Sequence, residues 1–297
     1  PPHIPLSNKK GLGYCNGQCP ARLTCDELQA LRITWGFTWG PGTPRRLADC
    51  RTVNGDPIEH IPMIWGMRDM DRIHTFPNSN SDYLLTFNEP ELYGQNNHID
   101  PVVAASAWHT LETWYPDKKL IAPAITVRYE WLDRMVEAYV GQYRRLPRFD
   151  ALAGHCYPGT LGRCRTLVNF LTDRAQRWGV PEGHWINEYA YYAPSGWNLD
   201  QYLNAGRHLE QTTTYLENHP HVDRYAWFTA KYTGYETYVS ENWDSRLCYC
   251  NAHELTLLGQ LYANIEPNTG TQDAPSRTEA ALELISPLEP YKHPYPP

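Results

Sequence analysis

Residues 83–90 read YLLTFNEP and residues 184–190 read HWINEYA, and these two stretches decide the predicted fold. Each is a short, strand-like apolar run that ends in Asn-Glu. Short runs that are largely apolar, without alternating polar residues, are typical of strands covered on both faces of a parallel sheet. We therefore expect Glu89 and Glu188 at the tips of two buried strands, where a carboxylate is poorly solvated and available for chemistry.

Six further runs of the same kind bring the number of predicted strands to eight. They are rich in Ile, Leu, Trp and Tyr, and most of the segments between them have a helical pattern. Alternating strands and helices predict a parallel sheet, and a count of eight predicts that this sheet closes into a barrel. The eight predicted strands are Gly11–Cys15, Ile33–Thr38, His60–Trp65, Tyr83–Asn88, Leu120–Ile125, Phe149–His155, His184–Glu188 and Arg224–Phe228.

Capping signals mark the starts of two helices. Thr24 and Glu27 have the spacing of a capping box. Asp100 followed by Pro101 is an N-cap with proline at the first helical position, opening a helix to about Trp114. Residues 41–57 and 68–81 carry little helical periodicity, so we expect short helices or loops in the second and third connections. Further helices are predicted at Tyr129–Arg145, Arg165–Trp178, Leu199–Asn218 and His253–Ile265.

The length agrees with an α/β fold of one domain, a (β/α)8 TIM barrel. Such a barrel takes about 250 residues, and the chain has 297. We expect the barrel over residues 1–265 and a Pro-rich tail over residues 266–297, which packs on the barrel or is a remnant linker.

The net charge of −7, without a basic tract, disfavours nucleic acid and anionic membranes. No apolar run approaches the roughly 20 residues of a membrane span, and we expect a monomer.

The eight cysteines, an even number, predict disulfides and a secreted protein in an oxidising compartment. Cys156 and Cys164 flank a loop that contains Tyr-Pro-Gly and are placed to close it. The remaining pairings stay open, because eight cysteines allow about 105 complete pairings. The alternative is a zinc site from Cys15, Cys19 and Cys25, although their spacing lacks the paired C-x₂-C of a structural zinc module.

The chain is rich in the aromatic residues that bind sugars. It has 11 Trp and 21 Tyr but only 6 Phe. Trp and Tyr combine a flat apolar face with a polar tip, although each can equally be a core residue. In a β/α barrel the active site is assembled at the carboxyl ends of the strands. The candidates at those ends are Trp35, Trp39, Trp65, Asn88, Glu89, His155, Tyr157, Glu188, Tyr189 and Trp227.

This set of candidates contains a pair of acids but no Ser-His-Asp set, no evident triple-ligand metal cluster and no phosphate-binding glycine loop. Two carboxylates facing one cavity are the machinery of glycosidic bond cleavage. The sequence therefore predicts a polysaccharide-cleaving enzyme that needs no cofactor and no metal.

The ordered motifs resemble glycoside hydrolase family 128 of clan A, over most of residues 11–265. The resemblance implies a retaining endo-β-1,3-glucanase, with Asn88-Glu89-Pro90 at the fourth strand and Glu188 at the seventh. The family usually has Thr where this chain has Asn187 and Trp where it has Cys156, so substrate details could differ. The matching segments are residues 62–66, 84–90, 122–124, 149–157, 185–190 and 225–228.

The retaining mechanism that the resemblance implies gives each candidate residue an expected role. Glu89 is the expected acid/base and Glu188 the expected nucleophile. Asn88 is expected to hold the 2-hydroxyl of the reacting sugar, and Trp227 to form the floor beneath it. His155 and Tyr157 are expected to hydrogen-bond Glu188 and keep it ionised. The expected sugar-stacking residues are Trp35, Trp39 and Trp65, and Tyr189 is a further substrate-binding candidate.

Alternatives remain for several of these residues. Glu89 could cap the helix after Pro90, Glu188 could form a structural ion pair, and His155 could hydrogen-bond backbone only. Glu91 is expected to point away from the site or to start the next helix, and Trp197 has only a weak case for reaching over the cleft. The rival functions are another clan A glycosidase acting on xylan, mannan, galactan or a furanoside, a glycan-binding barrel without activity, and a metal-dependent hydrolase.

Overall fold

The computed structural model describes residues 4–14, 22–70, 80–93, 98–157, 159–191, 199–230, 247–248 and 253–265. Several predictions fall outside these residues: the tail 266–297, the end of the first predicted strand at Cys15, the cysteines Cys19 and Cys250, and Trp197.

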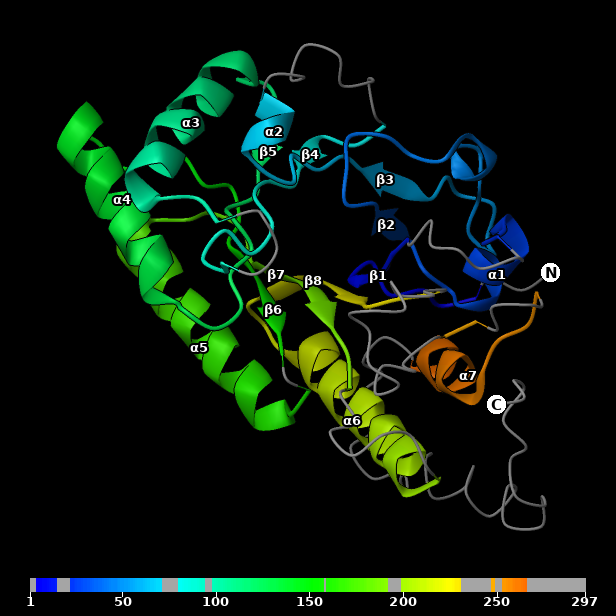
Figure 1. Cartoon of the computed structure of the whole chain (residues 1–297). Coiled ribbons are helices and arrows are strands. Elements are labelled where there is room, and N and C mark those ends of the chain that lie inside the picture. The colour runs from blue at the N-terminus through cyan, green and yellow to red at the C-terminus, as the bar shows by residue number, and fades with distance from the viewer. Residues whose placement is uncertain are drawn as a thin grey trace.

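In the described part of the chain, eight parallel strands form the centre of the molecule, each overlapping a predicted one (Figure 1). Six make one sheet in the order β3-β2-β1-β8-β7-β6, and β4 pairs with β5. Parallel bridges between Met63 and Leu85 and between Ile121 and Ala151 join these two sheets at both edges. The strands therefore follow one another around a closed ring, as in a (β/α)8 barrel. They are β1 (Lys10–Gly13), β2 (Trp35–Phe37), β3 (Glu59–Ile61), β4 (Tyr83–Leu84), β5 (Lys119–Leu120), β6 (Ala153–Cys156), β7 (His184–Tyr189) and β8 (Val222–Trp227).

The helices lie outside the strands, with the longer ones, α3 to α6, along one side in Figure 1. The Thr24 capping box is present, and Asp100 caps the helix that starts at Pro101. In their described residues, the second connection carries a 3₁₀ turn, Arg45–Leu47, and the third carries the one-turn α2, which agrees with the predicted short helices. The helices are α1 (Cys25–Ala30), α2 (Met67–Met70), α3 (Pro101–Trp114), α4 (Glu130–Tyr143), α5 (Leu161–Trp178), α6 (Leu199–Asn218) and α7 (Leu257–Asn264).

Two helix starts differ from the prediction for the same reason. Helix α5 begins at Leu161 because the Thr160 hydroxyl accepts a hydrogen bond from the Arg163 backbone N–H. Helix α7 begins at Leu257, where Thr256 caps it in the same way. A threonine cap satisfies a backbone donor that is otherwise unpaired in the first turn.

The core has two parts, separated by the ring of strands. The larger part lies between strands and helices and includes Leu12, Ile186 and Trp227. The smaller part fills the barrel and includes Met63, Leu85, Trp185 and Ala226. Neighbours such as Ala226 and Trp227 thus face opposite sides of the sheet, as the two-residue period of a strand requires.

One arginine closes the amino-terminal end of the barrel. The guanidinium of Arg224 lies over the rings of Trp35, Tyr83 and Trp185, at 5.4, 4.7 and 4.6 Å from their centroids. It also forms a 2.6 Å ion pair with Glu59. These contacts leave the opposite, carboxyl-terminal end of the strands for a site.

Two buried histidines should make the fold sensitive to acid. Burial lowers the pKa of His184 and of His208 from 6.5 to about 4. The unfolded chain therefore binds protons that the folded chain does not, so stability is intact above pH 6.5 and falls as the pH drops toward 4. The shift corresponds to about 3 kcal/mol for each histidine. Urea unfolding at pH 7 and pH 4.5 measures this loss.

The matched variants for this prediction are His208→Gln, which removes a buried titrating group, and His253→Gln at an exposed position. We expect the first to lose clearly less stability on acidification than the wild type, and the second to lose as much. Equal losses in all three proteins would contradict the assignment to buried histidine.

Candidate active site

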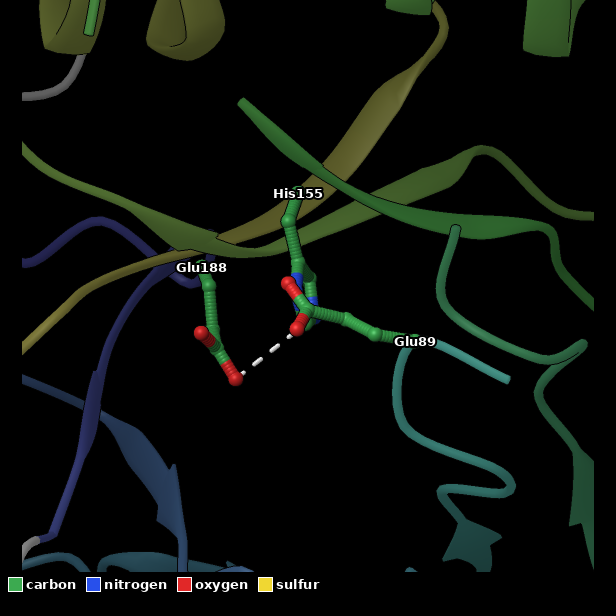
Figure 2. Close-up of side chains that lie close together, drawn as sticks. All are labelled: Glu89, His155 and Glu188. Atoms are coloured by element: carbon green, nitrogen blue, oxygen red, sulfur yellow. Dashed lines mark hydrogen bonds and ion pairs between the residues drawn. The ribbon is translucent and has the colours of Figure 1, made fainter. Parts of the chain in front are cut away.

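Three side chains from separate strands meet at the carboxyl-terminal end of the barrel. Glu89 follows β4, His155 lies on β6 and Glu188 on β7, and Figure 2 shows them pointing toward one another. One carboxylate oxygen of each glutamate and one ring nitrogen of the histidine all lie within 4.8 Å of one another. Both glutamates are 5% exposed. Two acids separated by 99 residues in the sequence, from 188 and 89, therefore share one small space.

A bulge in β7 turns Glu188 into this space. Against β6, Ala153 pairs with Trp185 and His155 with Glu188, so β7 uses three steps where β6 uses two. Against β8, Ile186 pairs with Tyr225 and Tyr189 with Trp227, which is the same surplus of one residue. Trp185 points into the barrel, and side chains of a regular strand alternate between its two faces. Without the bulge, Glu188 would therefore point outward to the helices. An extra residue re-aims the side chains beyond it.

The backbone of Glu89 is also specialised. Its φ of 45° lies in the left-handed region, which is uncommon for a residue with a side chain. Its N–H donates to the carbonyl of Ala124 at 2.8 Å, and its carbonyl accepts from the N–H of Leu92 at 3.1 Å. Unfavourable backbone geometry held by such bonds is concentrated at functional sites.

Two hydrogen-bond donors hold the Glu188 carboxylate. The indole N–H of Trp39 donates to Oε1 at 2.6 Å, and the Tyr157 hydroxyl donates to Oε2 at 3.3 Å. Donors of this kind stabilise the ionised form and fix its orientation. Tyr157 therefore makes the contact that the sequence predicted, whereas Trp39 contacts the glutamate through its indole nitrogen.

His155 lies between the two acids. Its Nδ1 is 2.8 Å from Glu89 Oε1, and its Nε2 is 3.6 Å from Glu188 Oε1. The closer partner is thus Glu89, although the sequence suggested Glu188. Burial lowers the pKa of His155, but the charges of Glu188 and Glu89 outweigh it and raise the pKa overall. The imidazole therefore favours a positive charge between two carboxylates.

The Glu188 carboxyl holds a proton more tightly than an exposed acid. Burial raises its pKa to about 7, with the charge of Glu89 adding to the rise, while His155, Trp39 and Tyr157 oppose it. Two interacting acids titrate as a pair. Burial and the charge of Glu89 thus both favour the protonated form of Glu188. The desolvation that causes this exists only in the folded chain.

Three predicted substrate contacts are wrong. Trp35 is buried in the barrel interior near its amino-terminal end, where its indole N–H donates to the Lys9 carbonyl at 2.9 Å. Tyr189 faces the helices and shares a 2.7 Å hydrogen bond with the Thr213 hydroxyl. Trp227 is fully buried in the outer core against Tyr189, at 5.0 Å between ring centroids. All three are core residues.

At the end of β8, Phe228 rather than Trp227 lies beside side chains of the site. Its ring lies 5.3 Å from that of Trp39 and 6.3 Å from that of Tyr157. The two-residue period of a strand predicts this difference from the sequence. If Ala226 faces the barrel interior, Phe228 faces it as well, and Trp227 between them faces the helices. A slip of one residue exchanges the two faces of a strand.

Trp65 and Asn88 stay candidates for substrate contact. The backbone N–H of Asn88 donates to the Trp65 carbonyl at 2.9 Å, so both lie at the carboxyl-terminal ends of neighbouring strands. The partly exposed Trp65 ring has the guanidinium of Arg68 at 5.4 Å from its centroid. Asn88 is buried directly before Glu89.

The predicted Cys156–Cys164 disulfide is confirmed. It joins the end of β6 to the first turn of α5 and so flanks Tyr157. A second disulfide joins Cys25 and Cys50. Cys25 is therefore not a thiolate ligand, and the zinc alternative that used it is wrong.

Glu91 was expected to point away, and it does, but into a buried position that supports the site. It is 1% exposed, and its Oε1 accepts from the N–H groups of Thr126 and Val127 at 2.6 and 3.2 Å. These bonds tie the loop after β4, which carries Glu89, to the loop after β5. The buried N–H groups of Thr126 and Val127 thus find their acceptor in the Glu91 side chain. The spacing of these residues in the sequence does not predict this contact.

Two substitutions of Glu91 distinguish the effect of its hydrogen bonds from the effect of its negative charge. Glu91→Gln keeps one carbonyl oxygen for both N–H groups, so we expect kcat within about threefold of the wild type. Glu91→Ala removes the acceptor and releases the Glu89 loop, and a misplacement of about 1 Å can cost roughly 100-fold. Hydrolysis of a soluble glycan substrate measures both, with melting temperature as the folding control. Equal losses in the two variants would assign the effect to charge.

None of the helices in the described part of the chain is long and apolar enough to cross a membrane.

Comparisons with known proteins agree with this geometry. The family model described as "Glycosyl hydrolase catalytic core" matches residues 11–262. Alkali-sensitive linkage protein 1 of Schizosaccharomyces pombe is 22% identical over 230 residues, which are 75% of this chain. The match spans only 39% of that relative's length.

Solved structures with the same fold include three glycoside hydrolases of family 128. A subgroup II endo-β-1,3-glucanase from Pseudomonas viridiflava is 26% identical, with a TM-score of 0.63, covering 88% of this chain and 99% of its own. A subgroup I endo-β-1,3-glucanase from Amycolatopsis mediterranei, in complex with laminarihexaose, is 22% identical with a TM-score of 0.63, covering 86% and 99%. A subgroup III curdlan-specific exo-β-1,3-glucanase from Blastomyces gilchristii is 22% identical with a TM-score of 0.62, covering 88% and 100%.

Proposed function

Because this chain belongs to the glycosyl hydrolase catalytic core family, we propose that it is a retaining β-1,3-glucanase with Glu89 as acid/base and Glu188 as nucleophile. The observation that carries the proposal is the short distance between the two acids, whose oxygens lie within 4.8 Å. Retaining glycosidases have carboxyl groups about 5–5.5 Å apart, whereas inverting ones need about 6.5–9.5 Å to admit a water.

The reaction follows from the positions of the two acids. Glu188 attacks the anomeric carbon while Glu89 gives a proton to the leaving oxygen, which forms a glycosyl-enzyme. Glu89 then takes a proton from water, which attacks the same carbon and releases the sugar with its original configuration. Trp39 and Tyr157 support Glu188 as an anion before attack and as a leaving group afterwards, through the hydrogen bonds at 2.6 and 3.3 Å.

His155 couples the two steps. Its ring contacts Glu89 at 2.8 Å and Glu188 at 3.6 Å, so a positive imidazolium stabilises whichever carboxylate is charged. The pair needs one proton on Glu89 when the substrate is bound. A positive imidazolium between the acids stabilises the ionised form of Glu188, against the burial that raises its pKa.

The choice of β-1,3-glucan is supported by the structural relatives, which include both endo-acting and exo-acting β-1,3-glucanases. We propose endo action on laminarin-type or curdlan-type chains. The disulfides Cys25–Cys50 and Cys156–Cys164 support a secreted enzyme, because such bonds persist in oxidising compartments. The retention of both acids argues against a glycan-binding barrel without activity.

Product analysis tests this proposal. The protein is incubated with laminarin, curdlan, xylan and mannan, and the products are resolved by chain length. We expect mixed oligosaccharides from the β-1,3-glucans and none from xylan or mannan. Early NMR spectra should show the β-anomer as the first product. Clear activity on another glycan alone would overturn the substrate, and an α-anomer would overturn the retaining mechanism.

A further inference from the structure

We propose that Glu89, His155 and Glu188 also form a binding site for a divalent transition-metal ion of the Zn²⁺ type, which inhibits the enzyme by taking the place of the reacting sugar. The inhibition rests on the proposed function, but binding of the ion does not. Among the residues that the structure describes, this is the one group of three His, Cys, Asp or Glu side chains close enough to hold an ion.

The distances between the donor atoms suit a small ion. One atom from each side chain lies within 4.8 Å of the other two. Zinc bonds to nitrogen and oxygen are about 2.0–2.2 Å long, so tetrahedral ligand atoms are about 3.4 Å apart. The His155 Nε2 and Glu188 Oε1 are already 3.6 Å apart. A rotation of the Glu89 side chain, which opens its 2.8 Å contact with His155 Nδ1, would bring the third donor into the same shell.

His155 supplies the second, independent observation. The residue is 1% exposed, and its Nε2 has no hydrogen-bond partner among the residues described, although it points toward Glu188. Its Nδ1 is held by Glu89 Oε1 at 2.8 Å. The buried Nε2 thus lacks a hydrogen-bond partner that a metal ion held with Glu188 would replace.

The donor set selects among metals. Two carboxylates balance the charge of a divalent ion, and an imidazole favours Zn²⁺, Co²⁺, Ni²⁺ or Cu²⁺. Ca²⁺ takes six to eight oxygen ligands and Mg²⁺ requires an octahedral oxygen shell with several waters. A buried site with three donors, one of them nitrogen, provides neither the six to eight oxygens of a Ca²⁺ site nor the octahedral oxygen shell of a Mg²⁺ site. We therefore expect Mg²⁺ and Ca²⁺ to have no effect at concentrations where Zn²⁺ inhibits.

Occupation by the ion and catalysis exclude one another. Glu188, which would attack the anomeric carbon, and Glu89, which would carry the proton, are both ligands of the proposed metal site. An ion bound between them also fills the space of the reacting carbon. Inhibition should therefore be competitive with the glycan and reversed by a chelator.

Binding is tested first without any glycan. The full chain is treated with a chelator, freed of it, and titrated with Co²⁺ alone, with visible absorption as the readout, followed by displacement with Zn²⁺. We expect one site per chain that is weakened at least about tenfold in His155→Gln and in Glu188→Gln, each of which removes a donor. The matched control is His109→Gln, because His109 also lies beside a glutamate, Glu112, at 3.9 Å, but without a third donor. It should bind like the wild type.

The inhibition arm then measures laminarin hydrolysis at several Zn²⁺ and substrate concentrations, with Mg²⁺ as the control ion. Equal Co²⁺ affinity in the wild type and in both site variants would overturn the metal site, as would inhibition that laminarin does not relieve. If no glycan is hydrolysed, the proposed function fails, while the Co²⁺ titration still decides the metal site. Two site variants are used so that misfolding of one, seen in its melting temperature, does not remove the test.

Discussion

Glu188→Gln should lower kcat on laminarin by at least about 10⁴-fold, because the amide cannot form the glycosyl-enzyme. The substitution is nearly isosteric, so the Trp39 and Tyr157 side chains keep their places, and substrate binding should change little. The measurement is the release of reducing sugar by purified wild-type and variant protein. Glu182→Gln is the matched control, since Glu182 lies in the loop before the same strand and pairs with Lys119 away from the site.

A chemical rescue assigns the role of Glu188 more directly. In Glu188→Ala a small anion such as azide fits where the carboxylate was, attacks the anomeric carbon from the same side, and yields an α-glycosyl azide from an activated β-glucoside. Recovery of this product identifies the nucleophile. Retention of near wild-type turnover in Glu188→Gln, or a β-glycosyl azide from Glu188→Ala, would contradict the role.

Glu89→Gln should lower kcat on laminarin by about 10²–10⁴-fold, the usual contribution of a general acid or base. The loss in glycosyl-enzyme formation should nearly disappear on an aryl β-glucoside with a good leaving group, since such a group departs without a proton. The rate of the initial burst of phenolate measures glycosyl-enzyme formation, and the slow turnover that follows measures hydrolysis of the glycosyl-enzyme. A loss of equal size on both substrates would contradict the role of Glu89 as acid/base.

The same variant tests the electrostatic coupling of the two acids. The charge of Glu89 helps to raise the pKa of Glu188 to about 7. Without that charge the pKa of Glu188 should fall, so the nucleophile stays ionised at lower pH. With the aryl substrate, we expect kcat/KM of Glu89→Gln to rise with pH to a plateau through a midpoint clearly below 7. A midpoint at or above 7 would show that burial alone sets the pKa.

The predictions that succeeded depended on local chemistry. Each of the eight predicted strands overlaps an observed one, since a short apolar run between helical segments has few other places to be buried. Thr24 and Asp100 cap the helices that their neighbours predicted. Cys156 and Cys164 are close enough in the chain for their loop to bring them together.

The predictions that failed concerned the directions of side chains. Trp35, Tyr189 and Trp227 were chosen by their place near strand ends, and the structure turns each of them into the core. Trp35 lies at the first residue of β2 and so at the wrong end of the barrel. Tyr189 and Trp227 face the helices because of pairing between neighbouring strands, while the Phe228 ring contacts Trp39 and Tyr157.

The amino-acid sequence by itself determined the kind of element at each position, the ring of eight strands and the two acids at strand tips, because hydrophobic runs and caps act over a few residues. Only the tertiary structure decided which side chains meet. The bulge that aims Glu188, the indole of Trp39 beneath it and the burial that raises its pKa all require strands far apart in the chain to lie side by side. Desolvation and register are properties of packed neighbours, so a single strand does not contain them.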